Sequence, residues 1–197
     1  MLLDREARLT VPLHVRPRVP FDLAKLVARS TSGRCFICEF LKGTPQYEHT
    51  TIHETDTAIA FLNMYPTLFG QVIVAPKAHL EQITGDFSEQ EYLRLQRFVF
   101  RVAEGVRKVL SPERVYILSL GSRAANAHVH WHIAPLPSGV PLEHQQYHAL
   151  MHEHGVVQVS AEEQTELVFK LKAAIADAGS PSHSRAGGNH GMGSTSA

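Results

Sequence analysis

Residues 126–137, NAHVHWHIAPLP, place a histidine at every second position. Successive side chains of a β-strand point to opposite faces. His128, His130 and His132 are therefore predicted to share one face, with neighbours about 6.5–7 Å apart. The opposite face would pack into a core through the apolar residues between them, Val129, Trp131 and Ile133.

A row of three imidazoles suits three different roles. Alternating histidines can converge on a zinc ion. One neutral imidazole can also attack an electrophile while its neighbours handle protons and charge. The third possibility is an exposed polar face that is rich in histidine by chance.

The rest of the chain predicts an α+β fold. Strands are expected at 57–62, 70–76, 114–120 and 127–135, and helices at 21–30, 88–110 and 160–179. Ser88 and Glu91 form a capping box at the start of the longest helix. Strands that follow one another so closely favour an antiparallel sheet, here of about five strands, with one long and one or two shorter helices.

The composition bounds the class of protein. With 197 residues and 44% hydrophobic residues, the chain is expected to form one domain (21–178) after an arm (1–20) and before a disordered Gly/Ser-rich tail (179–197). Lys+Arg and Asp+Glu balance at 19 each, which argues against a general nucleic-acid binder. The charged first residues do not resemble a signal peptide, and no apolar run is long enough to span a membrane, so a cytoplasmic protein is predicted.

The histidine segment and an upstream block together resemble a known family. His128 to Ala134 matches the pattern H-φ-H-φ-H-φ-φ, in which φ is a hydrophobic residue, of the histidine triad (HIT) superfamily of nucleotide hydrolases and transferases. Residues 57–83, TAIAFLNMYPTLFGQVIVAPKAHLEQI, are similar to the upstream sheet of that family, including its P-K-x-H element. The resemblance covers roughly residues 33–137 and implies a homodimer in which two sheets join.

The resemblance also implies a mechanism. His130 would attack the α-phosphorus of a nucleotide conjugate, such as a phosphoramidate or dinucleoside polyphosphate, and water would cleave the covalent nucleotidyl-histidine. His128 and His132 would stabilise charge on the phosphate and protonate the leaving group. An imidazole with an ordinary pKa of about 6.5 is largely neutral at pH 7, as a nucleophile must be. No organic cofactor is implied.

Substrate-binding residues are expected around the triad. Asn63 lies where the family carries a residue that binds the ribose hydroxyls, although it can equally cap the turn before Pro66. Ala124 stands where family members commonly carry a glutamine, so Ser122, Arg123 or Asn126 would contact the phosphate instead. Candidates for an apolar slot around the base, several of them better suited to the core, are Phe36, Ile37, Phe61 and Leu62.

Cys35 and Cys38 form a C-x-x-C pair, the usual half of a structural zinc site. By the resemblance, His79 and His128 would complete a Cys₂His₂ set. Two reduced thiols or a redox pair are the alternatives. His144, His148 and His152 would form one stripe if their segment were a continuous helix, either as a metal site or as a solvated face.

Three rival functions remain at this point. A phosphorylase or nucleotidyl transferase would resolve the intermediate with phosphate or a second substrate. A zinc-stabilised nucleotide-binding module would show little turnover. A metal enzyme with zinc held by all three triad histidines would lose its activity on chelation.

Overall fold

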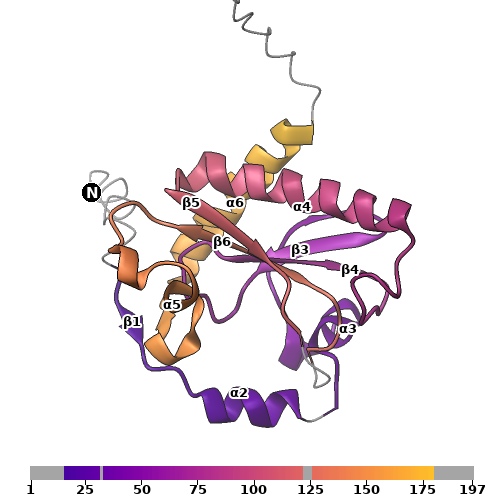
Figure 1. The fold of residues 1–197 in the computed structure, drawn as a ribbon, viewed down its shortest axis with the longest axis horizontal. Helices are drawn as coiled ribbons and strands as arrows, with labels where there is room; N and C mark the ends of the chain where they lie inside the picture. The colour runs from indigo at the N-terminus through magenta and orange to yellow at the C-terminus, as the bar shows by residue number, and fades with distance from the viewer. Residues whose placement is uncertain (1–15, 32, 122–125, 180–197) are drawn as a thin grey trace, which may run out of the picture.

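The computed structural model describes residues 16–31, 33–121 and 126–179. Its centre is an antiparallel sheet of five strands in the order β2-β3-β4-β6-β5 (Figure 1). The strands are β2 (Thr51–Glu54), β3 (Ala58–Leu62), β4 (Val72–Pro76), β5 (Arg114–Leu118) and β6 (Trp131–Leu136). This arrangement confirms the predicted fold class.

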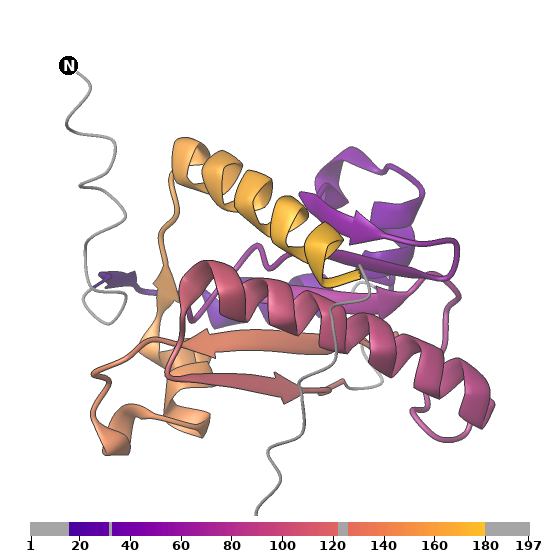
Figure 2. The same cartoon turned by 90° about the horizontal axis from the view of Figure 1, so that it is seen from above.

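Two long helices, α4 (Glu89–Leu110) and α6 (Ala161–Gly179), pack on each other over one face of the sheet (Figure 2). The opposite face carries shorter elements. They are the helices α2 (Leu23–Ser30), α3 (Phe36–Leu41) and α5 (Tyr147–Leu150) and the 3₁₀ turns η2 (Pro45–Tyr47), η3 (Leu142–His144) and η4 (His152–His154). A separate pair of short strands, β1 (Arg18–Val19) and β7 (Val156–Val157), ties the start of the described chain to the segment before α6.

The alternation predicted for the histidine segment determines which side chains face α4 and α6 and which face the shorter elements. Val129, Trp131 and Ile133 are buried in the main core with residues of α4 and α6. On the other face, Ile37 and Phe61 form a second buried cluster that holds α3 against the sheet. The histidines therefore lie on the face that the short elements cover.

The three predicted helices form within one or two residues of their predicted bounds. The capping box of Ser88 and Glu91 starts α4, and Asp22 caps α2 by accepting a hydrogen bond from the backbone N–H of Lys25. The predicted strand at 127–135 is wrong at its start, because β6 begins only at Trp131. His128 and His130 precede the strand, yet the segment keeps its alternation.

Three strands were not predicted. β2 has the sequence TIHE, which lacks a clear apolar alternation, and it lies at an edge of the sheet. β1 and β7 are two residues long and form only by pairing with each other.

Within the described residues, no helix is long and apolar enough to cross a membrane. The predicted tail lies almost entirely outside the described residues, as does most of the arm.

Candidate active site and metal site

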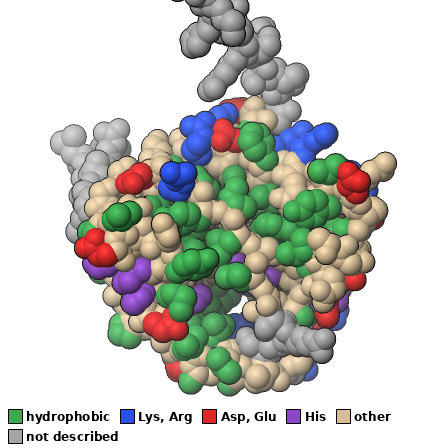
Figure 3. Space-filling view, in the orientation of Figure 1, with side chains coloured by type: hydrophobic (Ala, Val, Ile, Leu, Met, Phe, Trp, Pro, Cys, Tyr) green, Lys and Arg blue, Asp and Glu red, His purple; other side chains and the backbone are tan. Residues whose placement is uncertain are grey.

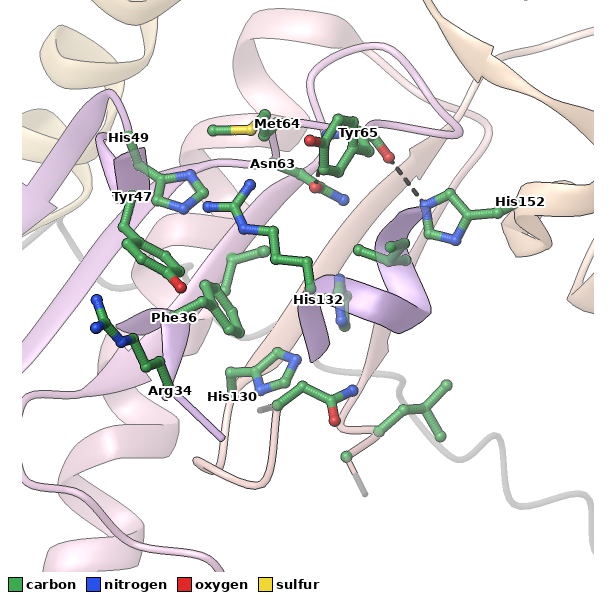
Figure 4. Close-up of a pocket in the computed structure, with 16 residues that line it drawn as sticks. Arg34, Phe36, Tyr47, His49, Asn63, Met64, Tyr65, His130, His132 and His152 are labelled. Carbon is green, nitrogen blue, oxygen red and sulfur yellow. Dashed lines mark hydrogen bonds between the residues drawn. The ribbon is translucent and has the colours of Figure 1, made fainter. Parts of the chain in front are cut away.

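His130 and His132 face a cleft of about 360 Å³ on the side of the sheet away from α4 and α6. Tyr47 and His49 lie on one side of the cleft and His152 on the other (Figure 4). A second cavity of about 430 Å³ is lined by residues 81–84, 119–121 and 127–130. His130 lines both cavities and thus stands between them.

The hydrogen bonds of His130 define its tautomer. Its Nδ1 lies 2.7 Å from the carbonyl oxygen of His128, and a carbonyl can only accept, so Nδ1 carries the proton. The lone pair is then on Nε2. Burial lowers the pKa of His130, so the ring is neutral at pH 7. Ser119 donates its hydroxyl to the carbonyl oxygen of His130 at 2.7 Å and helps to fix the backbone at this position.

Gln71 sets the opposite tautomer in His132. The backbone N–H of Thr67 donates to Gln71 Oε1 at 3.0 Å, which turns the amide so that its Nε2 donates to His132 Nδ1 at 3.4 Å. The proton of His132 is therefore on Nε2. Burial, followed by the neighbouring His130 and His152, lowers the pKa of His132 to about 3. A neutral His132 is thus a hydrogen-bond donor, and its ring centroid lies 5.0 Å from that of His130.

His128 has both ring nitrogens engaged elsewhere. It is fully buried, and its Nε2 donates to the carbonyl oxygen of Pro76 at 2.9 Å. Its Nδ1 lies 3.5 Å from Cys35 Sγ and 3.6 Å from Cys38 Sγ. This geometry does not support the expected role of His128 in stabilising the phosphate or protonating the leaving group.

Cys35, Cys38, His79 and His128 bring one ligand atom each to within 4.8 Å of one another. Tetrahedral zinc with bonds of about 2.3 Å to sulfur and 2.0–2.1 Å to nitrogen places S and N about 3.6 Å apart. The observed S···N separations of 3.5 and 3.6 Å at His128 match that value, and the 3.2 Å between Cys38 Sγ and His79 Nδ1 is slightly shorter. These four residues therefore fit a structural zinc ion.

The outer contacts support the same conclusion. Histidines that bind zinc usually donate their second N–H to a carbonyl or carboxylate, which orients the ring. His128 does so to Pro76, and His79 Nε2 lies 3.1 Å from Glu81 Oε1. Cys35 also caps α3, because its Sγ accepts the N–H of Cys38. The site would join α3 to the sheet.

The predicted substrate residues are only partly brought together. Asn63 and Asn126 line the cleft with Phe36. Asn63 also holds its turn, because its Oδ1 accepts the N–H of Tyr65 at 3.0 Å. Leu62 is a wrong candidate for the base slot: the pleat turns it into the core beneath α4 and α6. Ile37 and Phe61 are buried behind the cleft, and Ser122, Arg123 and Ala124 lie outside the described residues.

Several cleft residues were not predicted. Arg29 of α2 donates to the carbonyl oxygen of Gln46 at 2.7 Å and lies over the ring of Tyr47. His49 has a buried Nε2 for which the described residues provide no hydrogen-bond partner. No local pattern marks these residues, since the cleft is assembled from distant segments.

The continuous helix that a stripe of His144, His148 and His152 would need does not form. The segment is divided into η3, α5 and η4. His152 lines the cleft, where its Nε2 donates to the carbonyl oxygen of Tyr65 at 3.1 Å. The other two histidines lie in a separate cavity.

Comparison with known proteins identifies the family of this chain. The family model of the HIT domain matches residues 44–138. A protein of Schizosaccharomyces pombe named adenosine 5'-monophosphoramidase hnt1 is 30% identical over 107 residues, which cover 53% of this chain and 75% of the yeast protein. The chain belongs to the HIT family. An uncharacterised HIT-like protein of Saccharolobus solfataricus is also 30% identical, over 54% of this chain and 77% of its own length.

Solved structures show the same HIT fold. A hypothetical histidine triad nucleotide-binding protein of Sulfolobus tokodaii superposes with a TM-score of 0.58 at 22% identity, over 73% of this chain and 93% of that protein. A zinc-bound histidine triad protein of Mycobacterium smegmatis gives 0.57 at 21% identity, over 73% and 94%. In this HIT protein, α2 contributes Leu26 and Arg29 to the cleft.

Proposed function

We propose that this HIT protein is a nucleotidyl hydrolase that cleaves a nucleotide conjugate at its α-phosphorus through a covalent intermediate on His130. The observation that carries this proposal is the pair of opposite tautomers. His130 offers a lone pair on Nε2, and His132 offers an N–H on Nε2. A nucleophile that lines both cavities and a hydrogen-bond donor that lines the cleft thus stand side by side.

In the first step, His130 Nε2 forms a bond to phosphorus as the bond to the leaving group breaks, and the leaving group takes one proton from solvent water as it departs. The ring then carries a positive charge, which its Nδ1–H shares with the carbonyl oxygen of His128 at 2.7 Å. Water attacks phosphorus in the second step, releases one proton to solvent, breaks the P–N bond and restores the neutral ring. His132 is assigned to hydrogen-bond a non-bridging phosphate oxygen, because its low pKa makes it a poor source of a full proton.

The cleft suits a nucleoside. Phe36, Tyr47 and Ile73 provide an apolar surface for a base, and the unpartnered Nε2 of His49 can bond a base edge. Asn63 at the cleft wall is assigned to the ribose, using the amide group that the turn leaves available. The leaving group would occupy the second cavity. The name of the yeast relative supports an adenosine phosphoramidate as the first substrate to test.

Cys35, Cys38, His79 and His128 are assigned to a structural zinc ion, and His128 is no longer assigned a catalytic role. The nucleophile is then His130 itself, and zinc supplies rigidity rather than a reacting group.

The same proposal includes a homodimer. Ile117 on the edge strand β5 and Phe100 on α4 are 48% and 64% exposed, which favours contact with a second sheet. Ile117→Arg should yield a monomer in light scattering, and an unchanged mass would contradict this interface.

The decisive experiment is turnover of adenosine 5'-phosphoramidate by wild-type protein and His130→Ala, with His53→Ala as a matched control outside both cavities. His130→Ala should lose at least about a thousandfold in kcat and keep its affinity for AMP, whereas the control should retain turnover. An acid-labile adduct on His130 should be trapped by rapid quenching. A wild-type protein that binds AMP without turnover would indicate a binding module instead.

Products identify the second substrate. Water yields AMP from the intermediate, and phosphate yields ADP. ADP formation that depends on added phosphate would make the protein a phosphorylase.

A further inference from the structure

A third cavity, separate from the cleft, has a volume of about 300 Å³. The segment between β6 and α6 forms one wall, and residues around β1 and the start of β4 form the other. It shares no described lining residue with the nucleotide cleft. Histidine side chains gather at this flank of the molecule (Figure 3), at the position of α5 in Figure 1.

Three imidazoles are stacked in this cavity. The ring centroids of His144 and His148 lie 4.6 Å apart with planes 24° from parallel. Those of His148 and His154 lie 3.8 Å apart at 11°. Burial and then the neighbouring His154, His144 and Arg18 lower the pKa of His148. Arg18, which is permanently cationic, is among these causes, and no anionic group is.

Two arginines line the same cavity. Arg16 pairs with Glu163 at 2.8 Å, but its side chain is only 8% exposed and its buried Nε has no hydrogen-bond partner within the described residues. Arg18 donates to the carbonyl oxygen of Ala149 at 3.2 Å, and burial lowers its pKa. No carboxylate is among the described residues that line the cavity. Guanidinium groups withdrawn from water are normally neutralised by an anion.

A metal ion fits this cavity poorly. Stacked rings hold their nitrogens in parallel planes and do not direct them to one point. Within the described part of the chain, only Cys35, Cys38, His79 and His128 bring three or more metal-binding atoms together. Guanidinium groups, by contrast, match the oxygens of a phosphate group.

The geometry points to a binding site for a phosphate-bearing anion, formed by Arg16, Arg18 and the stack of His144, His148 and His154. The cavity is larger than a phosphate ion, and apolar side chains of Leu68, Phe69 and Val140 complete its wall. The site therefore suits a phosphate monoester of a small organic molecule. Inorganic phosphate presents the same oxygens and serves as the simpler probe.

The test is titration of the full chain with inorganic phosphate and, separately, with ribose 5-phosphate, followed by calorimetry and the ring NMR signals of His148 and His154. Both ring signals should shift. Arg18→Gln combined with His148→Gln should weaken binding at this site at least tenfold, and the exposed Arg97→Gln on α4 should leave it unchanged. Tighter binding of ribose 5-phosphate identifies a monoester as the occupant, and tighter binding of phosphate identifies the free ion.

Ring signals that neither probe moves would overturn the inference, as would a double variant that binds like wild type. Rings that respond to zinc alone would also overturn it. The exposed His154→Gln provides a second variant if the double variant does not fold. Turnover by His130 is measured separately, so failure of this site and failure of the proposed hydrolase are distinguishable.

Discussion

Removal of the predicted zinc ion tests how the active-site face is held together. Cys35, the N-cap of α3, and Cys38, within that helix, are separated by 93 and 90 residues from His128, so a shared metal closes a loop of that length. A cross-link over a loop of about 100 residues lowers the entropy of the unfolded chain and so raises the free energy of unfolding by about 4–5 kcal/mol. For a chain of this size each kcal/mol corresponds to about 2–4 °C in Tm, so a loss of about 8–20 °C is expected.

The assay combines metal content by plasma mass spectrometry with thermal unfolding before and after chelation. Cys38→Ser and His79→Gln should each lose zinc and unfold at the temperature of the chelated wild type. His53→Gln, a histidine variant away from the four ligands, should keep its zinc. Chelation should add little further destabilisation to Cys38→Ser, because the ligand set is already broken.

Two results would refute this reasoning. In the first, the wild-type protein carries no zinc after expression with zinc, and its Tm does not respond to zinc or a chelator. This result would mean that the four residues pack together without binding a metal. Immediate loss of turnover on chelation with an unchanged Tm would instead favour a metal held by the triad histidines.

The remaining predictions concern the triad, the helix packing and acid stability. Gln71→Leu should lower kcat on the order of 10–100-fold in steady-state kinetics with a small change in KM, because His132 loses the partner that sets its tautomer; equal kcat would contradict this role. Gly105→Ala should reduce the free energy of unfolding in urea by about 1–3 kcal/mol, since the new Cβ would lie 2.4 Å from Ile175 Cγ1; a neutral effect would mean that α6 shifts freely. Burial and then Arg29 lower the pKa of His49 to about 4 from an ordinary 6.5, so the folded state binds fewer protons than the unfolded state. The contribution of His49 to the free energy of unfolding should be fully present above pH 6.5 and should be lost as the pH falls toward 4. Urea unfolding of His49→Phe should therefore show a shallower loss of stability in that pH range than wild type.

Local patterns in the sequence determined much of the architecture. The alternation of residues 128–133 predicted which side chains enter the core, and Val129, Trp131 and Ile133 are there. The capping box of Ser88 and Glu91 predicted where α4 begins. These signals are readable because each depends on residues only a few positions apart. The spacing of the C-x-x-C pair likewise predicted half of a metal site, and the family resemblance supplied the other half.

Only the tertiary structure decided how the histidines are shared among sites. His128 turns to the thiols at the start of α3, whereas His132 pairs with Gln71, which precedes β4 and lies 61 residues away in the sequence. His152 joins the cleft, while His144 and His148 stack with His154 beside the arginines near β1. An imidazole has the same chemistry at every position in the sequence. Its role is set by which distant backbone carbonyl, amide or charge the packed chain places beside it, and no local spacing encodes that contact.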